Sequence, residues 1–269
     1  MKVIRDHDKL YLTADYKKNP KESFKFLARE AGPFLDRRPN ASVLDIGCAT
    51  GDFLHYLSSL YPKARLHGLD VMRSLIARAR KETKNIRYFV GDITDRKTLP
   101  ALRFDVVFMI GIHSIFDDFR PWMDNCLGLL NDGGKLFVMG TFNPEPVDVL
   151  VKVRDVSRTE GDKWQSGWNL ISIKTVSRYL DRRKADYGFT GWNIPIDIAK
   201  NGADPLRSWT ERMENGDRLV INGAQLRHTV HVLEISLPKK RSLLKKPHMQ
   251  GAKKRATRRA GRHVAGASD

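Results

Sequence analysis

Three carboxylates surround one short turn of small residues in this 269-residue sequence. Asp45 stands two positions before Gly47, Asp52 directly follows Gly51, and Asp70 ends the next apolar run. Small residues at such a turn let a ligand approach the backbone closely. Because the carboxylates favour positive charge and repel negative charge, the spacing predicts a site for a cationic ligand rather than for a polyphosphate.

Two common phosphate-binding turns fit this stretch poorly. A P-loop needs Lys followed by Ser or Thr after its last glycine, whereas Gly51 is followed by Asp52 and Phe53. An anionic side chain at that position opposes a phosphate at the helix N-terminus. The dinucleotide fingerprint needs Gly-x-Gly-x-x-Gly, and the spacing from Gly47 to Gly51 is different.

The segment "DIGCATG" resembles the Asp/Glu-x-Gly-x-Gly-x-Gly signature of class I S-adenosylmethionine-dependent methyltransferases, with Ala49 in place of the middle glycine. Later segments resemble further motifs of this family in the same order. They are the acid Asp70, "VGDIT", "FDVVFMIGIHSIFDD", and "LLNDGGKLFV" with Asp132 in place of a proline. The resemblance covers residues of about 40 to 142 and implies a methyltransferase that uses S-adenosylmethionine.

The resemblance also implies which residues hold the cofactor. Asp45 would place negative charge near its ammonium group, and Asp70 would accept hydrogen bonds from both ribose hydroxyls. Asp92 would meet the adenine amino group beside Ile93. The cofactor set that we predict is Asp45, Gly47, Cys48, Ala49, Gly51, Asp70, Val71, Asp92, Ile93 and Ile110.

His113 is the candidate catalytic base. It follows the fourth apolar run, at the sheet edge where open α/β proteins bind ligands, and histidine titrates near neutrality. The alternative is a packed loop histidine. Methyl transfer is an in-line displacement in which proximity supplies much of the catalysis, so a base is needed only where the acceptor must lose a proton early. No metal is predicted, since no His, Cys and Asp cluster has ligand spacing.

The acceptor region is expected within residues 151–210, which are rich in Trp and Arg. Trp164 and Trp168 are candidates to stack on a flat ligand face, with packing as the alternative. Arg154 and Arg207 are candidates to hold a carboxylate or phosphate. We therefore predict a small-molecule or glycan acceptor, methylated at a hydroxyl or carboxyl group.

Two signatures of nucleic-acid methyltransferases are missing. The place after the fourth strand reads "IGIH" and lacks the Asn/Asp-Pro-Pro-Tyr/Phe segment of amino-directed enzymes. Enzymes that methylate cytosine C5 need a nucleophilic cysteine in an active-site loop. Cys48 lies in the turn and Cys126 lies in a predicted helix, so neither cysteine has that position.

Alternating strands and helices must position these residues. Apolar runs predict strands at 42–47, 64–70, 86–92, 104–111 and 135–142, with helices between them. This alternation predicts an α/β fold, a doubly wound, mostly parallel seven-stranded Rossmann-like sheet with a substrate-side insertion after strand five. Further along, the pattern predicts a helix at 172–184 capped by Ser172, strands at 188–198 and 225–235, and a hairpin at 208–223.

The N-terminal part is predicted to add a flap and a helix at residues 1–39. In "NPKESFKFLAREAG" Asn19 would cap the helix, Pro20 would begin it and Gly32-Pro33 would stop it. The methyltransferase domain is expected at 40–237, with the cofactor core at 40–145 and the substrate-side region at 146–237.

Charge is concentrated at the C-terminal end. Eleven of the residues 238–269 are Lys or Arg and one is acidic, so this segment contributes +10 to the net charge of +17. With few large apolar residues it is predicted to be a disordered basic tail. It is either simply solvated or in contact, through charge alone, with nucleic acid, acidic lipid or an acidic partner.

Cysteine content and the length of the apolar runs bear on the cellular location. Two cysteines and the lack of an apolar run of membrane-spanning length predict a cytoplasmic protein. The first alternative function is an RNA or ribosome-associated methyltransferase that uses the basic tail. The second is a non-catalytic scaffold that binds S-adenosylmethionine. The sequence does not specify the acceptor atom or the oligomeric state.

Overall fold

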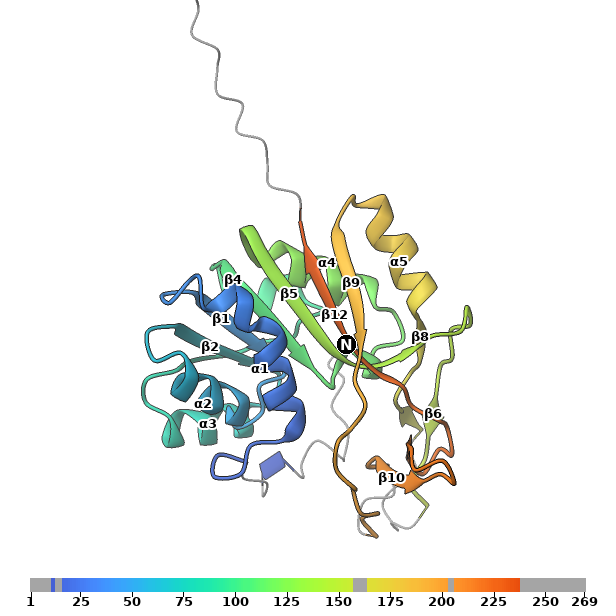
Figure 1. Cartoon of the computed structure of the whole chain (residues 1–269). Helices are drawn as coiled ribbons and strands as arrows, with labels where there is room; N and C mark the ends of the chain where they lie inside the picture. Colours follow the sequence, from blue (N-terminus) through green and yellow to red (C-terminus); the bar gives the residue numbers. More distant parts are fainter. Residues whose placement is uncertain (1–10, 13–15, 157–163, 203–205, 238–269) are drawn as a thin grey trace, which may run out of the picture. The chain divides into compact units, whose positions relative to one another are not determined.

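The apolar runs form one central sheet in the computed structural model, which describes residues 11–12, 16–156, 164–202 and 206–237. The predicted basic tail at 238–269 lies outside the described residues. Seven strands follow the order β3-β2-β1-β4-β5-β12-β9, and an eighth, β8, pairs with the end of β5 (Figure 1). The predicted doubly wound sheet is confirmed, with one strand more than expected.

Most of the sheet is parallel. The five parallel strands of the core are β1 (Ser42–Ile46), β2 (Arg65–Asp70), β3 (Arg87–Val90), β4 (Phe104–Ile110) and β5 (Leu130–Asn143). β8 (Ile171–Ser172) also runs parallel to β5. β12 (Val230–Ser236) is antiparallel to both of its neighbours, β5 and β9 (Asp186–Gly191). Parallel strands end at the same edge, so the segments after β1, β2, β3 and β4 meet there.

Helices cover both faces of the sheet because successive strand side chains point to opposite faces. Val43 packs in a cluster with α1 (Glu22–Leu35), α2 (Asp52–Leu60) and α3 (Arg73–Glu82). Its neighbour Leu44 packs in a second cluster with α4 (Arg120–Gly128) and α5 (Ile173–Arg182). Figure 1 shows α1, α2 and α3 gathered at the blue end of the sheet. The two cores hold the strand ends in register.

The predicted boundaries of α1 are wrong at both ends. The helix begins at Glu22 after Lys21, so Asn19 does not cap it, and it continues through Pro33 to Leu35. Pro33 is exposed near the last turn, where a missing N–H costs little. Phe34 and Leu35 beyond it are buried, and their burial favours the longer helix.

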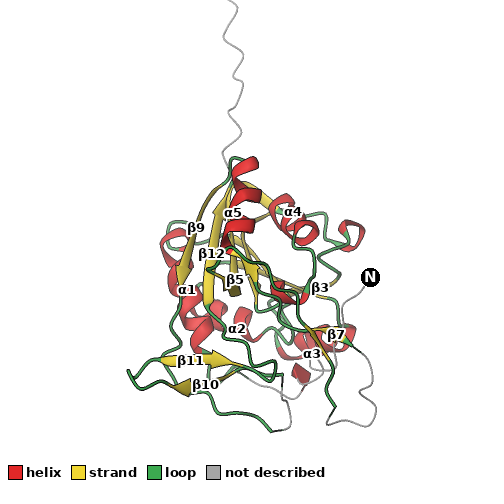
Figure 2. Cartoon of the chain, turned by 90° about the vertical axis from the view of Figure 1, so that its right-hand side faces the viewer, coloured by secondary structure: helices red, strands yellow, loops and turns green. Residues whose placement is uncertain are grey.

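Two small hairpins lie outside the central sheet. β6 (Lys152–Val153) pairs with β7 (Gln165–Ser166), and β10 (Trp209–Arg212) pairs with β11 (Arg218–Ile221). The second confirms the predicted hairpin, which turns with Gly216 at φ 83°. Figure 2 shows β10 and β11 set apart from the sheet. Ser172 caps α5 as predicted, with its side chain accepting a hydrogen bond from the Lys174 N–H.

The described helices are short. The longest described helix, α1, has 14 residues, and no helix in the described ranges has the length and apolar character needed to span a membrane.

Candidate active site

The small-residue turn lies between the end of β1 at Ile46 and the start of α2 at Asp52. Gly47 and Gly51 have φ values of 72° and 80°, a left-handed conformation that favours glycine. A Cβ on Gly47 would lie 2.6 Å from the Ile112 side chain. Both glycines are therefore fixed by the local geometry.

Ala49 stands where the family signature has its middle glycine, and it also has a positive φ, 47°. Its N–H donates to Asp70 Oδ2 at 3.0 Å, which compensates part of the cost of a left-handed alanine. Asp70 Oδ1 accepts from the Met72 N–H at 2.8 Å. The Asp70 carboxylate thus ties the ends of β1 and β2 together.

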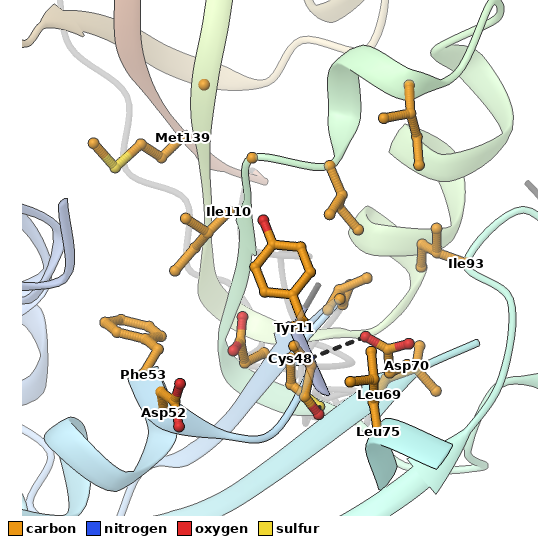
Figure 3. Close-up of a pocket in the computed structure, with 18 of the residues that line it drawn as sticks. Tyr11, Cys48, Asp52, Phe53, Leu69, Asp70, Leu75, Ile93, Ile110 and Met139 are labelled. Atoms are coloured by element: carbon orange, nitrogen blue, oxygen red, sulfur yellow. Dashed lines mark hydrogen bonds between the residues drawn. The ribbon is translucent and has the colours of Figure 1, made fainter. Parts of the chain in front are cut away.

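A cavity of about 330 Å³ opens over this turn. Figure 3 shows Asp70 and Ile93 on one side of it and Phe53, Ile110 and Met139 on the other. Nine members of the predicted cofactor set line it, namely Asp45, Gly47, Cys48, Ala49, Asp70, Val71, Asp92, Ile93 and Ile110. The structure therefore brings these residues together around one space of ligand size.

Gly51 is the exception in the cofactor set. It does not line the cavity, and a Cβ there would lie 2.2 Å from the Tyr88 hydroxyl. The glycine is needed because the turn packs against Tyr88, which contacts Thr83 Oγ1 at 2.6 Å. Gly51 allows the turn to pack closely against Tyr88 on the side away from the cavity. The prediction that it contacts the cofactor is not supported.

Asp45 is the most unusual carboxylate of the cavity. It is buried, and within the described chain its Oδ1 has no hydrogen-bond partner. Burial, together with the nearby Asp70 carboxylate, raises the pKa of Asp45 well above its usual range. A cationic ligand group would offset both effects. Burial also raises the pKa of the Cys48 thiol, so Cys48 is a packed, protonated side chain.

Asp92 and Ile93 follow β3 on the Asp70 side of the cavity. Asp92 Oδ1 accepts hydrogen bonds from the N–H and hydroxyl of Thr94, at 2.9 and 2.7 Å. These bonds fix the carboxylate at the cavity wall. Ile93 is buried beside it and supplies an apolar surface for a flat ring.

His113 is placed differently from the prediction. It lies in the short 3-10 turn His113–Ile115, outside the cavity lining, and its side chain is buried. Nε2 donates to the Thr141 carbonyl at 3.0 Å, and the ring stacks on Phe142 at 4.5 Å between centroids. Burial lowers the pKa of His113 to about 4. The ring fills the core behind β5, so the structure does not support a role as base.

The predicted acceptor residues separate into two groups. Trp168 lines the cavity. Its neighbour Asn169 is fully buried and holds the segment in place through hydrogen bonds to Phe116 O and Asp117. Trp164 is 66% exposed and does not line the cavity, and Arg154 lies over its ring at 5.4 Å. Arg207 also lies outside the lining and donates to the Tyr16 hydroxyl at 2.9 Å.

The residues before α1 form a part of the cavity wall that could not be predicted from the sequence. Tyr11, Tyr16 and Lys21 all line the cavity, and Figure 3 shows the Tyr11 ring projecting into it. Asp52 anchors this segment by accepting from the Tyr16 N–H at 3.3 Å and from Lys17 Nζ at 2.7 Å. The only sequence signal was the flap expected at the N-terminus. In the described ranges, no group of three or more His, Cys, Asp or Glu side chains is arranged to hold a metal.

Comparison with known proteins identifies the core. Residues 44–136 match the family model described as a methyltransferase domain. This range contains the turn, Asp70, Asp92 and Ile93. The chain contains a class I S-adenosylmethionine-dependent methyltransferase domain. Its buried Asp45 acceptor and the Asp70 and Asp92 carboxylates fit a cofactor with an ammonium group, a ribose and an adenine.

Curated relatives of the domain are also methyltransferases. Malonyl-[acyl-carrier protein] O-methyltransferase of Bacillus anthracis is 31% identical over 43% of this chain and 44% of its own length. Trans-aconitate 2-methyltransferase of Escherichia coli strain 55989 is 29% identical over 50% of this chain and 55% of its own length. The chain thus spans about half the length of these relatives.

Solved structures share the methyltransferase fold beyond the matched range. The plantazolicin methyltransferase BpumL has a TM-score of 0.51 and 18% identity, over 86% of this chain and 92% of its own. DhpI, in a complex with SAM, has a TM-score of 0.50 and 14% identity, over 85% of this chain and 94% of its own. At these identities the likeness shows the fold alone.

Proposed function

We propose that this protein is a methyltransferase that transfers the methyl group of S-adenosylmethionine to an oxygen of a small acceptor molecule. The observation that carries the proposal is the cavity, in which Asp45, Asp70 and Asp92 face one space beside the Gly47 turn. The proposed cofactor residues are the nine that line it. Relatives named for small acids, including trans-aconitate, support an acceptor of this size.

The chain's own residues bind and align rather than move a proton. When bound, S-adenosylmethionine supplies a methyl group on a positively charged sulfur, which leaves as a neutral thioether. Apolar side chains from β4 and β5, Ile110 and Met139, line the cavity and limit the access of water. A carboxylate acceptor already carries the electron pair that attacks the methyl carbon, so this reaction needs no base. The placement of His113 in the core is consistent with that mechanism.

Methyl-labelled S-adenosylmethionine tests the proposal. The full chain is incubated with the labelled cofactor and a cell extract separated into small-molecule, glycan, RNA and protein fractions. We expect label in the small-molecule or glycan fraction, over several turnovers per protein molecule. Several turnovers would exclude a non-catalytic scaffold. Label confined to the protein or RNA fraction would contradict the small acceptor.

The basic segment 238–269 favours a second candidate, methylation of RNA. A net charge of +10 provides affinity for phosphates that falls steeply with salt. Removing residues 238–269 would then abolish labelling of RNA at physiological salt and leave binding of S-adenosylhomocysteine unchanged. Equal labelling of RNA by the full and shortened chains would contradict a role for the segment.

We also propose that the protein acts in the cytoplasm.

A further inference from the structure

One cation, Lys21, stands at the cavity wall among aromatic rings. Lys21 lines the cavity, and no carboxylate of the described residues lies within ion-pair distance of its Nζ. The nearest groups are aromatic rings: Nζ lies 4.1 Å from the Tyr16 centroid, 5.4 Å from that of Tyr11 and 5.5 Å from that of Phe24. Such an aromatic environment stabilises a cation only in part.

A second cation stands beside the first. Arg207 donates to the Tyr16 hydroxyl, and the Tyr16 ring in turn contacts Lys21. Burial, and secondly the charge of Arg207, lower the pKa of Lys21 to about 8. The Asp52 carboxylate acts in the opposite direction, but it already accepts hydrogen bonds from Lys17, the Tyr16 N–H and the Thr50 hydroxyl. Two cations held close together are stabilised by an anion bound beside them.

The position of Lys21 indicates which end of the ligand space it serves. Phe24 lies 5.3 Å from Phe53 between ring centroids, and Figure 3 shows Phe53 across the cavity from Asp70 and Ile93. On the same helix, Phe26 stacks at 5.5 Å on Trp192, another lining residue, from the chain after β9. Lys21 therefore lies at the end of the cavity away from the proposed ribose and adenine contacts.

We propose that Lys21, supported by Arg207, binds a carboxylate of the acceptor, so that this protein methylates an acidic small molecule. This inference rests on the proposed function and specifies its substrate class. The ammonium group holds the acid in place by charge and hydrogen bonding, while Tyr11, Tyr16 and Phe24 fix the amine at the wall. A carboxylate oxygen of this acid takes the methyl group and becomes a methyl ester, so no proton has to be removed from the acceptor.

Calorimetry with small acids tests the assignment. Malonate and trans-aconitate are titrated into the full chain saturated with S-adenosylhomocysteine, with malonamide as the neutral control. We expect at least one acid to bind, Lys21→Met to weaken that binding at least tenfold, and Lys21→Arg to retain it within about threefold. Since arginine cannot act as a base, retained binding and turnover in Lys21→Arg would distinguish anion binding from proton transfer.

A pH series gives an independent readout. The acid should bind about tenfold more weakly at pH 9 than at pH 7, because Lys21 loses its charge as the pH rises through about 8. Tyr11, Tyr16, Asp52 and Arg207 are the other polar or charged groups that face it. The Lys21→Arg variant should show little of this loss, since its guanidinium stays charged.

Four outcomes would overturn the assignment. The first is that neither acid binds to the wild-type chain. The second and third are that Lys21→Met binds the acid as well as the wild-type chain does, or that the wild-type chain binds malonamide as well as the acid. The fourth is that Lys21→Met loses affinity for S-adenosylhomocysteine but not for 5′-methylthioadenosine. The last would assign Lys21 to the carboxylate of the cofactor. A wild-type chain that fails to bind S-adenosylhomocysteine would instead contradict the proposed function itself.

Discussion

At the scale of single residues, Asp70 joins the turn to the proposed cofactor contact. Its two oxygens accept from Ala49 and Met72, and a carboxylate oxygen can accept more than one hydrogen bond. We expect Asp70→Ala to weaken S-adenosylhomocysteine binding about tenfold to a hundredfold, since hydrogen bonds to a charged group contribute about 1.5–3 kcal/mol. Titration calorimetry measures the change.

The matched control for this prediction is Asp95→Ala. Asp95 is an exposed carboxylate outside the cavity that caps a short 3-10 turn by accepting from the Lys97 N–H. This variant should bind as the wild-type chain does. Equal affinities of all three proteins, with unchanged thermal unfolding, would contradict the placement of the cofactor at Asp70.

Residues that follow a strand closely could be predicted, and residues that depend on distant packing could not. Asp70 and Asp92 directly follow or end apolar runs, and parallel strands bring such positions to one edge. Lys21 lies in the cavity only because the chain before α1 packs on Phe24 and meets Arg207, 186 positions further on. For His113 the sequence showed the position after β4, but not the direction of the side chain into the core.

At the scale of elements, the carboxylate of Asp52 holds the segment 16–21 over the turn. Asp52 accepts from the Tyr16 N–H and from Lys17 Nζ, and Lys17 also pairs with Glu82 of α3 at 2.6 Å. Because this segment forms part of the cavity wall, loosening it should speed ligand release. We expect Asp52→Asn to raise the dissociation rate of S-adenosylhomocysteine about tenfold, measured by stopped-flow tryptophan fluorescence.

Glu82→Gln is the control at this scale. It removes the outer partner of Lys17 and leaves the hydrogen bonds of Asp52 intact, so the dissociation rate should change less than about twofold, as is usual for exposed pairs. Equal acceleration in both variants would assign the effect to Lys17 rather than to the anchor at Asp52.

At the scale of the whole molecule, periodicity predicted the sheet well and its additions poorly. The runs that became the central strands β1 and β4 are buried along nearly their whole length, as strands covered by two helix layers require. β8 has two residues and pairs with the end of β5, which is too short for a sequence pattern to reveal. The end of α1 depended on the burial of Phe34 and Leu35, a tertiary effect that outweighed the local proline signal.

The free energy of unfolding should depend on pH because His113 is buried. Its pKa is about 4 in the folded chain and about 6.5 when unfolded. The unfolded chain therefore binds a proton first as the pH falls, and stability is lost between pH 6.5 and 4. One such group contributes about 3 kcal/mol over this range. His67, His228 and His231 are shifted in the same direction and add to the slope.

Urea unfolding from pH 4 to 7 measures the contribution of His113 to the pH dependence of the unfolding free energy, by comparing two variants with the wild-type chain. His113→Gln keeps a donor for the Thr141 carbonyl but removes the titrating ring, so its stability should fall less steeply with acid than that of the wild-type chain. His55→Gln changes an exposed histidine of α2 and should leave the slope unchanged. A His113→Gln slope equal to that of His55→Gln would show that the imidazole is not held neutral in the core. The same result would contradict the burial of a neutral imidazole between Thr141 and Phe142.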